Sequence, residues 1–249
     1  MLGTNLGTTA ISCAAIDDVS AWLLLAVLTA MVHSAQSWHR LAVTLLLLIA
    51  FVAIMLFPIR RAASSLESLY QKHGAGVQLI SLSILIMLVA SFTTERLGVH
   101  ALFGAFMAGL VMPKSEPMIA EIVERIESLS LALLLPLFLA VTGLRTRIDL
   151  LTDRSLWGYT AAIITTAVLG KLAGAALTAK ATGMTWTDSL ALGVLMNTRG
   201  LVELVVLNAG LDLGVLSPAL FTKMVIMALV TTLMTTPILI TMKVQPHGM

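Results

Sequence analysis

The strongest constraint on the fold is a series of long apolar segments in a chain of 249 residues. In residues 41–59 only Thr44 and Pro58 interrupt the apolar side chains. A bilayer core of about 30 Å needs about 20 apolar residues in a helix, because unpaired backbone groups are costly in hydrocarbon. The sequence therefore predicts an all-α, multi-pass membrane protein with about eight transmembrane helices. These spans are expected at residues 10–32, 41–59, 77–92, 99–112, 129–144, 156–179, 186–209 and 218–240.

The composition excludes several classes of protein. Hydrophobic residues make up 58% of the chain and charged residues only 11%, whereas about a quarter of a soluble domain is charged. A net charge of +2 argues against an electrostatic nucleic-acid binder. Cys13 is the only cysteine, so we expect neither a disulfide framework nor a thiolate metal cluster. The five histidines lie at loops or span edges without the spacing of metal ligands, so we expect no resident metal. No ATP- or NAD-binding motif is present, so we expect no cofactor and an ion gradient as the driving force.

Three less regular segments connect or interrupt these spans. Residues 60–76 are polar and basic, which predicts a loop. Residues 114–128 carry apolar side chains at helical spacing among charges, which predicts an amphipathic helix lying along the membrane interface. In the short span at residues 99–112, Gly104 and Ala108 are four positions apart and predict close packing against another helix.

Two adjacent carboxylates lie in the first span. A charge at mid-bilayer costs at least about 2.5–3.5 kcal/mol, which makes Asp17 and Asp18 functional candidates. Consecutive helical side chains diverge by about 100°, so one carboxylate can face a cavity while the other faces a neighbouring helix. The two negative charges repel each other, so one of the carboxylates takes up a proton more readily than an isolated one would. This property suits a site that exchanges a proton for a cation. The alternative is that residues 10–32 do not span the membrane and the pair caps a surface helix.

Lys171 is a basic residue within a later span. It lies between Gly170 and Gly174, whose spacing predicts a face that another helix can approach closely. A lysine at this depth needs a carboxylate partner or must lose its proton, and Asp17 or Asp18 could supply the carboxylate. The alternative is that Lys171 extends its side chain toward the membrane interface.

Polar residues also interrupt the span at residues 186–209. Asn197, Thr198, Arg199 and Gly200 are typical of an unwound helix that lines a cavity at membrane depth. Arg199 and Glu203 are four positions apart, so they can form an ion pair on one helical face. The alternative is that these polar side chains reach the interface from a tilted, continuous helix.

Three segments resemble the monovalent cation:proton antiporter-2 family. They are Ala-Ala-Ile-Asp-Asp-Val-Ser-Ala-Trp at residues 14–22, His-Ala-Leu-Phe-Gly-Ala-Phe-Met-Ala-Gly-Leu-Val-Met-Pro at 100–113, and Asn-Thr-Arg-Gly-Leu-Val-Glu-Leu-Val-Val-Leu-Asn at 197–208. They occur in the family's order along essentially the whole chain, and they are most similar to the branch of plant and fungal cation/H⁺ exchangers and their bacterial relatives.

The resemblance implies an inverted-repeat antiporter that works by elevator-like alternating access. Asp18 would bind either the cation or the proton, and Asp17 would be its companion, able to pair with Lys171. Arg199 and Glu203 would brace the interrupted helix, with Asn197 beside them. The domain organisation that follows is a paired-acid core helix at residues 10–32, linker and dimerisation helices at 41–144, and second-repeat core helices at 156–242.

The resemblance also implies that residues 1–249 form only the C-terminal part of the fold. Family members have several spans before the paired acids, which here lie in the first span. We therefore expect about four or five further spans upstream in a complete transporter. We expect the 249-residue chain to insert into membranes without exchanging ions by itself. The complete protein is expected to be a homodimer, with the bacterial inner membrane as its location.

The function that we favour is exchange of Na⁺ or K⁺ for protons, a transport activity and not an enzymatic one. A potassium efflux protein of the glutathione-gated type, with channel-like conduction, is one alternative, and a non-transporting truncated fragment is another. An intramembrane aspartyl protease is disfavoured, because its two aspartates lie on separate facing helices whereas Asp17 and Asp18 are adjacent. The sequence leaves the choice between Na⁺ and K⁺ open.

Overall fold

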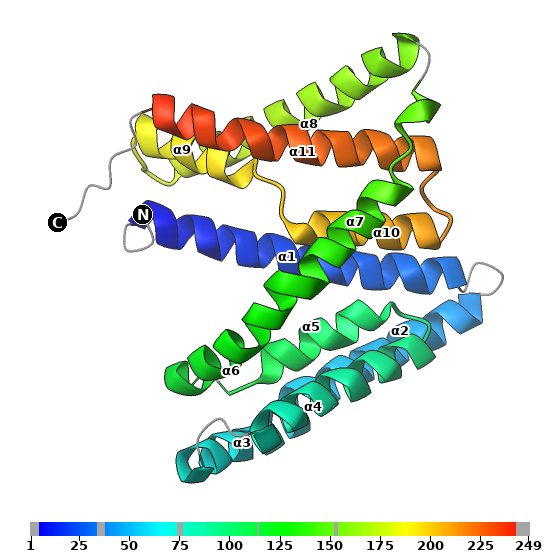
Figure 1. Cartoon of the computed structure of the whole chain (residues 1–249), viewed down its shortest axis with the longest axis vertical. Coiled ribbons are helices and arrows are strands. Elements are labelled where there is room, and N and C mark those ends of the chain that lie inside the picture. The colour runs from blue at the N-terminus through cyan, green and yellow to red at the C-terminus, as the bar shows by residue number, and fades with distance from the viewer. Residues whose placement is uncertain (1–4, 34–37, 74–76, 114, 152–153, 243–249) are drawn as a thin grey trace. The chain divides into compact units, whose positions relative to one another are not determined.

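The computed structural model describes residues 5–33, 38–73, 77–113, 115–151 and 154–242, and in these ranges all regular secondary structure is helical, with short turns between the helices (Figure 1). Within the described residues, seven helical segments are long and apolar enough to cross a membrane, and α5 is a shorter apolar helix. The prediction of an all-α, multi-pass fold is therefore confirmed. The α-helices are α1 (Asn5–His33), α2 (Trp38–Ile54), α3 (Arg60–His73), α4 (Val77–Arg96), α5 (Ala101–Val111), α6 (Glu116–Leu129), α7 (Leu135–Arg145), α8 (Arg154–Ala181), α9 (Trp186–Met196), α10 (Leu201–Asp212) and α11 (Pro218–Thr241).

The predicted polar loop at residues 60–76 is wrong over residues 60–73, which form α3; residues 74–76 lie outside the described part of the chain. The chain stays helical past Pro58 through a π-helical turn, η1 (Met55–Ile59), in which the Arg60 N–H reaches the carbonyl of Met55. Proline lacks an N–H and crowds the preceding turn, and the wider turn accommodates both effects. The polar composition of residues 60–73 did not indicate that α3 has a buried face, which carries Ala63 and Leu66.

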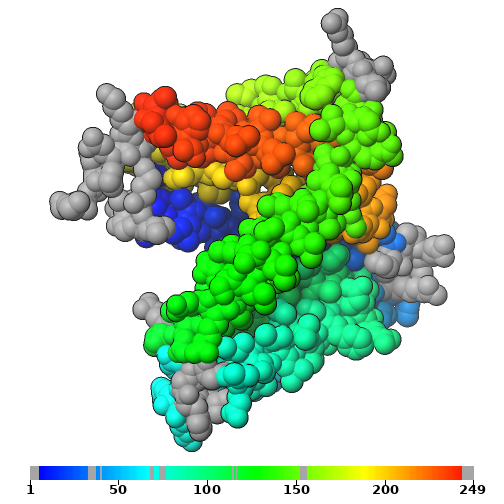
Figure 2. All heavy atoms as spheres, in the orientation of Figure 1, coloured from blue at the N-terminus to red at the C-terminus, as the bar shows by residue number. Residues whose placement is uncertain are grey.

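The amphipathic helix predicted at residues 114–128 is present as α6, but it is continuous with the span that follows. The connection is a second π-helical turn, η2 (Ser130–Leu134), closed by a hydrogen bond from the Leu135 N–H to the Ser130 carbonyl. Pro136 follows at the second position of α7, so both π-helical turns lie at or next to a proline. Figure 2 shows the continuous outer surface of this long helix, where many leucines of η2 and α7 are exposed, as in a lipid-facing span.

The chain divides into two compact units. One comprises Met1–Ala21 and Val141–Met249, and the other comprises Trp22–Ala140, so that α1 and α7 each contribute to both. Residues far apart in the sequence therefore belong to the same unit. The first unit contains every ionisable residue that the sequence singled out.

Close packing of α5 on α4 organises the unit formed by residues 22–140. A Cβ atom added at Gly104 would overlap the carbonyl group of Ala90 and lie 2.6 Å from the hydroxyl of Thr94. Only a glycine permits this approach of the two backbones, as the small-residue pattern predicted. Gly98, with φ of 79°, provides the tight turn between the two helices. The ring of Phe103, which lies on α5 like Gly104, contacts the ring of Phe51 of α2, with the ring centroids 6.5 Å apart.

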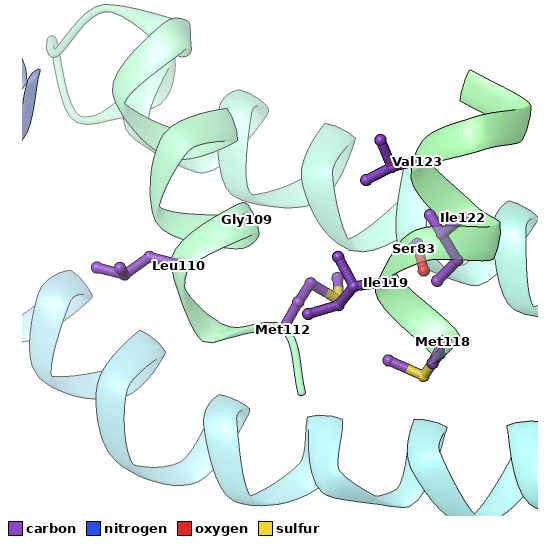
Figure 3. Close-up of a pocket in the computed structure, with 8 residues that line it drawn as sticks. All are labelled: Ser83, Gly109, Leu110, Met112, Met118, Ile119, Ile122 and Val123. Carbon is purple, nitrogen blue, oxygen red and sulfur yellow. The ribbon is translucent and has the colours of Figure 1, made fainter. Parts of the chain in front are cut away.

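A cavity of about 510 Å³, here called the small cavity, lies among α4, α5 and α6 in this unit. Figure 3 shows the side chains that line it, with Met112 at the end of α5 near Ile119 of α6. Among the described residues, Ser83 supplies a polar group and the other lining residues are apolar or glycine.

Close packing of α9 on α8 organises the other unit. A Cβ atom at Gly193 would lie 2.6 Å from the carbonyl oxygen of Leu172, so the glycine lets α9 approach the α8 backbone. The N-terminal half of α1 joins this pair, since Leu6 is buried in one cluster with Ala179 and Leu192. These contacts place the first span beside α8, from which Lys171 projects.

We expect Gly104→Ala to destabilise the protein, because the added methyl group collides with backbone atoms of α4 and overpacking of this kind costs about 1–3 kcal/mol. The matched control is Gly109→Ala on the same helix, where an added Cβ atom meets no atom within 4 Å. The measurement is the thermal unfolding midpoint of the detergent-solubilised protein. Equal midpoints for the two variants would contradict the inferred packing.

Candidate functional site

An ion pair joins the first span to α8. Lys171 Nζ lies 2.9 Å from Asp17 Oδ2, and the two side chains are 32% and 49% exposed. The residues are separated by more than 150 positions, and the packing of α1 on α8 and α9 brings them together. This is the carboxylate partner that a lysine within a span requires. Charge and depth alone allowed either Asp17 or Asp18 as the partner, whereas the family resemblance implied Asp17, and Asp17 is the partner in the structure.

A cavity of about 430 Å³ opens beside this ion pair and is here called the Lys171 cavity. Asp17, Lys171, Gly170 and Gly174 line it together with residues of α9. A Cβ atom at either glycine would meet no atom within 4 Å, so among the described residues no helix packs against them. The close helix approach predicted at Gly170 and Gly174 is therefore wrong for this part of the chain. The glycines instead widen the space next to the charges.

The carboxylate of Asp18 is exposed, and among the described residues it makes neither a hydrogen bond nor an ion pair. Since Asp17 and Asp18 follow each other on α1, their side chains point in different directions, as the helical geometry predicts. One carboxylate is thus paired with an ammonium group, and its neighbour is left available. Together with Lys171, the two aspartates carry one net negative charge.

The predicted interruption of the span at residues 186–209 is confirmed. Residues 197–200 separate α9 from α10, and Figure 1 shows the chain leaving the helical path between these two half-helices. Leu192 and Met196 of α9 line the Lys171 cavity, so the interruption begins directly after a residue that faces it. The unwound segment and the ion pair therefore lie in the same region of this unit.

Threonines of α11 bond to the backbone of Arg199 and to the hydroxyl of Thr198 in the interruption. The Thr232 hydroxyl accepts a hydrogen bond from the Arg199 N–H at 3.2 Å and lies 3.0 Å from the carbonyl oxygen of the same residue. The Thr198 hydroxyl donates to that of Thr235 at 3.0 Å. Backbone groups released from a helix at membrane depth need such partners. Sequence reasoning missed Thr232 and Thr235, although hydroxyls three positions apart in an apolar helix are an available signal.

Arg199 and Glu203 form an ion pair across the start of α10, with Arg199 Nη1 3.1 Å from Glu203 Oε2 and both side chains less than 20% exposed. Arg199 follows the C-terminus of α9, where the helix dipole is negative, and Glu203 lies in the first turn of α10, where it is positive. The pair therefore compensates the ends of both half-helices. Asn197 is 1% exposed, and its Oδ1 has no hydrogen-bond partner among the described residues.

A second polar cluster, also missed by sequence reasoning, fixes the end of α7 to α10. The buried Asn208 side chain donates to the Thr142 hydroxyl at 3.0 Å and accepts from Arg145 at 3.2 Å. Arg145 also pairs with Asp212 at 2.9 Å. The partners are more than 60 positions apart, so no local spacing indicates them. This cluster holds the second half-helix in place.

We expect Thr232→Val to destabilise the protein, because it leaves the N–H and carbonyl of Arg199 without these hydrogen bonds, at a cost of about 1–3 kcal/mol. Thr241→Val is the matched control on α11, since within the described residues the Thr241 hydroxyl bonds to the carbonyl of Ile238 in its own helix. Both are read out as unfolding midpoints in detergent. A Thr232→Val midpoint no lower than that of the control would disprove the bracing role.

Comparison with known proteins shows similarity along nearly the whole chain. Residues 1–241 match the sequence model of a family described as "Sodium/hydrogen exchanger, transmembrane". The chain is 36% identical over 244 residues to the Na(+)/H(+) antiporter NhaS4 of Synechocystis sp., which covers 98% of this chain and 59% of that protein. It is 38% identical over 245 residues to Cation/H(+) antiporter 19 of Arabidopsis thaliana, covering 96% of this chain and 30% of that protein.

A fungal relative shows the same pattern. The chain is 35% identical over 237 residues to K(+)/H(+) antiporter 1 of Saccharomyces cerevisiae, covering 93% of this chain and 27% of that protein. The chain therefore spans between 27% and 59% of the length of these three relatives.

Proposed function

This chain belongs to the sodium/hydrogen exchanger family of membrane proteins, and on that premise we propose that it forms part of a secondary transporter that exchanges a monovalent cation for protons. The names of its relatives include Na⁺, K⁺ and unspecified cations, which supports Na⁺ or K⁺ as the transported ion in this proposal. The observation that carries the proposal is the pairing of Lys171 with Asp17, which leaves the neighbouring carboxylate of Asp18 without a partner in the part of the chain that the structure describes.

Charge balance explains why such a site would exchange ions. Two carboxylates and one ammonium group carry one net negative charge, and either one proton or one monovalent cation neutralises it. Residual charge is costly at membrane depth, so the site favours one of the two neutral states and disfavours holding both ions. In this proposal Asp18 binds the proton or the cation, and Asp17 with Lys171 fixes the charge around it.

The interrupted helix has a supporting role in this proposal. Asn197, Arg199 and Glu203 hold an unwound segment next to the helix end that lines the Lys171 cavity. A segment without helical hydrogen bonds offers polar atoms to a passing ion, and the unpartnered Oδ1 of Asn197 is one of them. Movement of this site between the two faces of the membrane would give alternating access.

We further propose that the chain is organised as a transport core, residues 10–32 and 156–242, and as linker and dimerisation helices, residues 41–144. The grouping of Met1–Ala21 with Val141–Met249 in one compact unit supports this division for residues 10–21 and 156–242, whereas residues 22–32 are grouped with residues 33–140. The complete transporter would be a homodimer in a membrane, and the bacterial inner membrane is the location that we propose.

We expect Asp18→Asn to abolish cation-driven proton movement in a transporter that carries this segment. The amide keeps the size of the side chain but holds neither a proton nor a bare cation as a carboxylate does. The measurement is the proton flux in inverted vesicles after addition of Na⁺ or K⁺, with similar amounts of folded protein verified for each variant.

Asp149→Asn is the matched control, because it removes an exposed carboxylate that pairs with Arg147, outside the site. It should keep full activity. Full exchange in Asp18→Asn would refute the assignment of the binding carboxylate, and cation current without coupled proton movement would indicate a channel-like mechanism instead.

We expect Asp17→Asn to reduce the flux and to change its pH dependence without abolishing it, because the ion-binding carboxylate is kept while Lys171 loses its partner. The double variant Asp17→Asn/Lys171→Gln tests whether the two residues act as a pair. Residues in direct contact are coupled, so the loss in the double variant should be smaller than the product of the two single losses. Independent, multiplicative losses would show that the ion pair does not contribute to transport.

A further inference from the structure

The two π-helical turns, η1 and η2, each lie at or next to a proline, but they differ in their surroundings. In η1 the Met55 side chain is 4% exposed, and one turn earlier the ring of Phe51 contacts the ring of Phe103 on α5. In α3, which follows η1, Ala63 and Leu66 are buried. Neighbouring side chains therefore hold the chain before, within and after η1.

The turn η2 has no such support among the described residues. It lies near the middle of Pro117–Leu150, a single helical segment of 34 residues that can be followed in Figure 1. All residues between Met118 and Thr142 are described, and none of them is buried. The three leucines of η2 are between 52% and 56% exposed. This part of the segment is therefore held by its own backbone.

That backbone lacks α-helical hydrogen bonds at two consecutive positions. The N–H of Leu135 donates to the carbonyl of Ser130, five residues earlier, instead of to that of Leu131. Pro136 has no N–H, and in an α-helix its ring would crowd the carbonyl of Ala132. Helices bend sharply at prolines and at π-helical turns, and both features coincide here.

The two ends of the same segment are held in place. Met118 of α6 is 1% exposed and belongs to one buried cluster with Leu79 of α4. At the other end, the Thr142 hydroxyl accepts a hydrogen bond from Asn208 of α10, and Arg145 donates another to the same side chain. A change in the direction of α7 is therefore transmitted to α10, the half-helix that begins at the interruption.

We propose that η2 and Pro136 form a hinge at which α7 changes direction relative to α6, whereas packing keeps η1 rigid. The two turns have the same backbone chemistry, since each combines a π-helical turn with a proline. The buried neighbours of η1 are what distinguishes them. Bending at η2 displaces α10 without unfolding either held end of the helix. The hinge is independent of ion exchange, because it depends only on the backbone and the packing of this helix.

The test is the distribution of distances between two spin labels on the 249-residue chain in lipid vesicles, measured by pulsed electron paramagnetic resonance. Cys13→Ser removes the native thiol, and cysteines for labelling replace exposed residues. The hinge pair is Leu88→Cys on α4 with Leu144→Cys on α7, and the reference pair is Leu88→Cys with Glu124→Cys on α6, before η2.

Residue 144 lies about 15 Å beyond the end of η2 at 1.5 Å per residue. A bend that varies by about 20° moves this position through about 5 Å, so we expect the hinge pair to give a distribution wider by about that amount than the reference pair. Pro136→Ala restores an N–H donor and removes the ring, and it should narrow the distribution of the hinge pair toward that of the reference pair.

A third pair tests the contrast with η1. Leu46→Cys on α2 lies before η1, so its distance from Leu88→Cys on α4 reports bending at that turn. We expect this distribution to be as narrow as that of the reference pair. Equal widths for the hinge and reference pairs, or no narrowing in Pro136→Ala, would overturn the proposed hinge. A pair across η1 as wide as the hinge pair would show that packing does not distinguish the two turns, which also contradicts the proposal.

Discussion

The need to satisfy every backbone polar group inside the membrane is the constraint on which the rest of this structure depends. It makes the described chain helical and turns each departure from an α-helix into a feature that requires an explanation. At Pro58 and before Pro136 the helix widens by one residue, and the chain remains helical. At residues 197–200 it unwinds, and hydroxyls of α11 replace the lost partners at Arg199 and Thr198.

The same constraint applies to charge. Lys171 and Asp17 are tolerated within spans because each is the other's counter-ion, and Arg199 and Glu203 stand in the same relation at the interruption. What distinguishes Asp18 is that it has no such partner among the described residues. In the proposed exchange, this difference makes Asp18 the group that takes up the proton or the cation.

Glycines lie at two kinds of position in this structure, at close contacts between helices and beside a cavity. Gly104 and Gly193 bring α5 onto α4 and α9 onto α8, whereas Gly170 and Gly174 border open space beside Lys171. The same small-residue spacing therefore has two outcomes. The surrounding helices decide between contact and cavity, which is why the packing prediction holds at Gly104 and fails at Gly170.

Hydropathy and local spacing by themselves determined the all-α membrane fold, the interrupted span and the pairing of Arg199 with Glu203, because each depends on residues within a few helical turns. They did not determine that α3 is a helix, since its buried face exists only through contact with Leu79 and Met118. Hydropathy and spacing did not choose between Asp17 and Asp18 as the partner of Lys171; the family resemblance implied Asp17, and the packing of the helices brings it within 2.9 Å. Only the tertiary structure joined Asn208 to Thr142 and Thr232 to Arg199. Such partners are distant in sequence, and packing of whole helices brings them together.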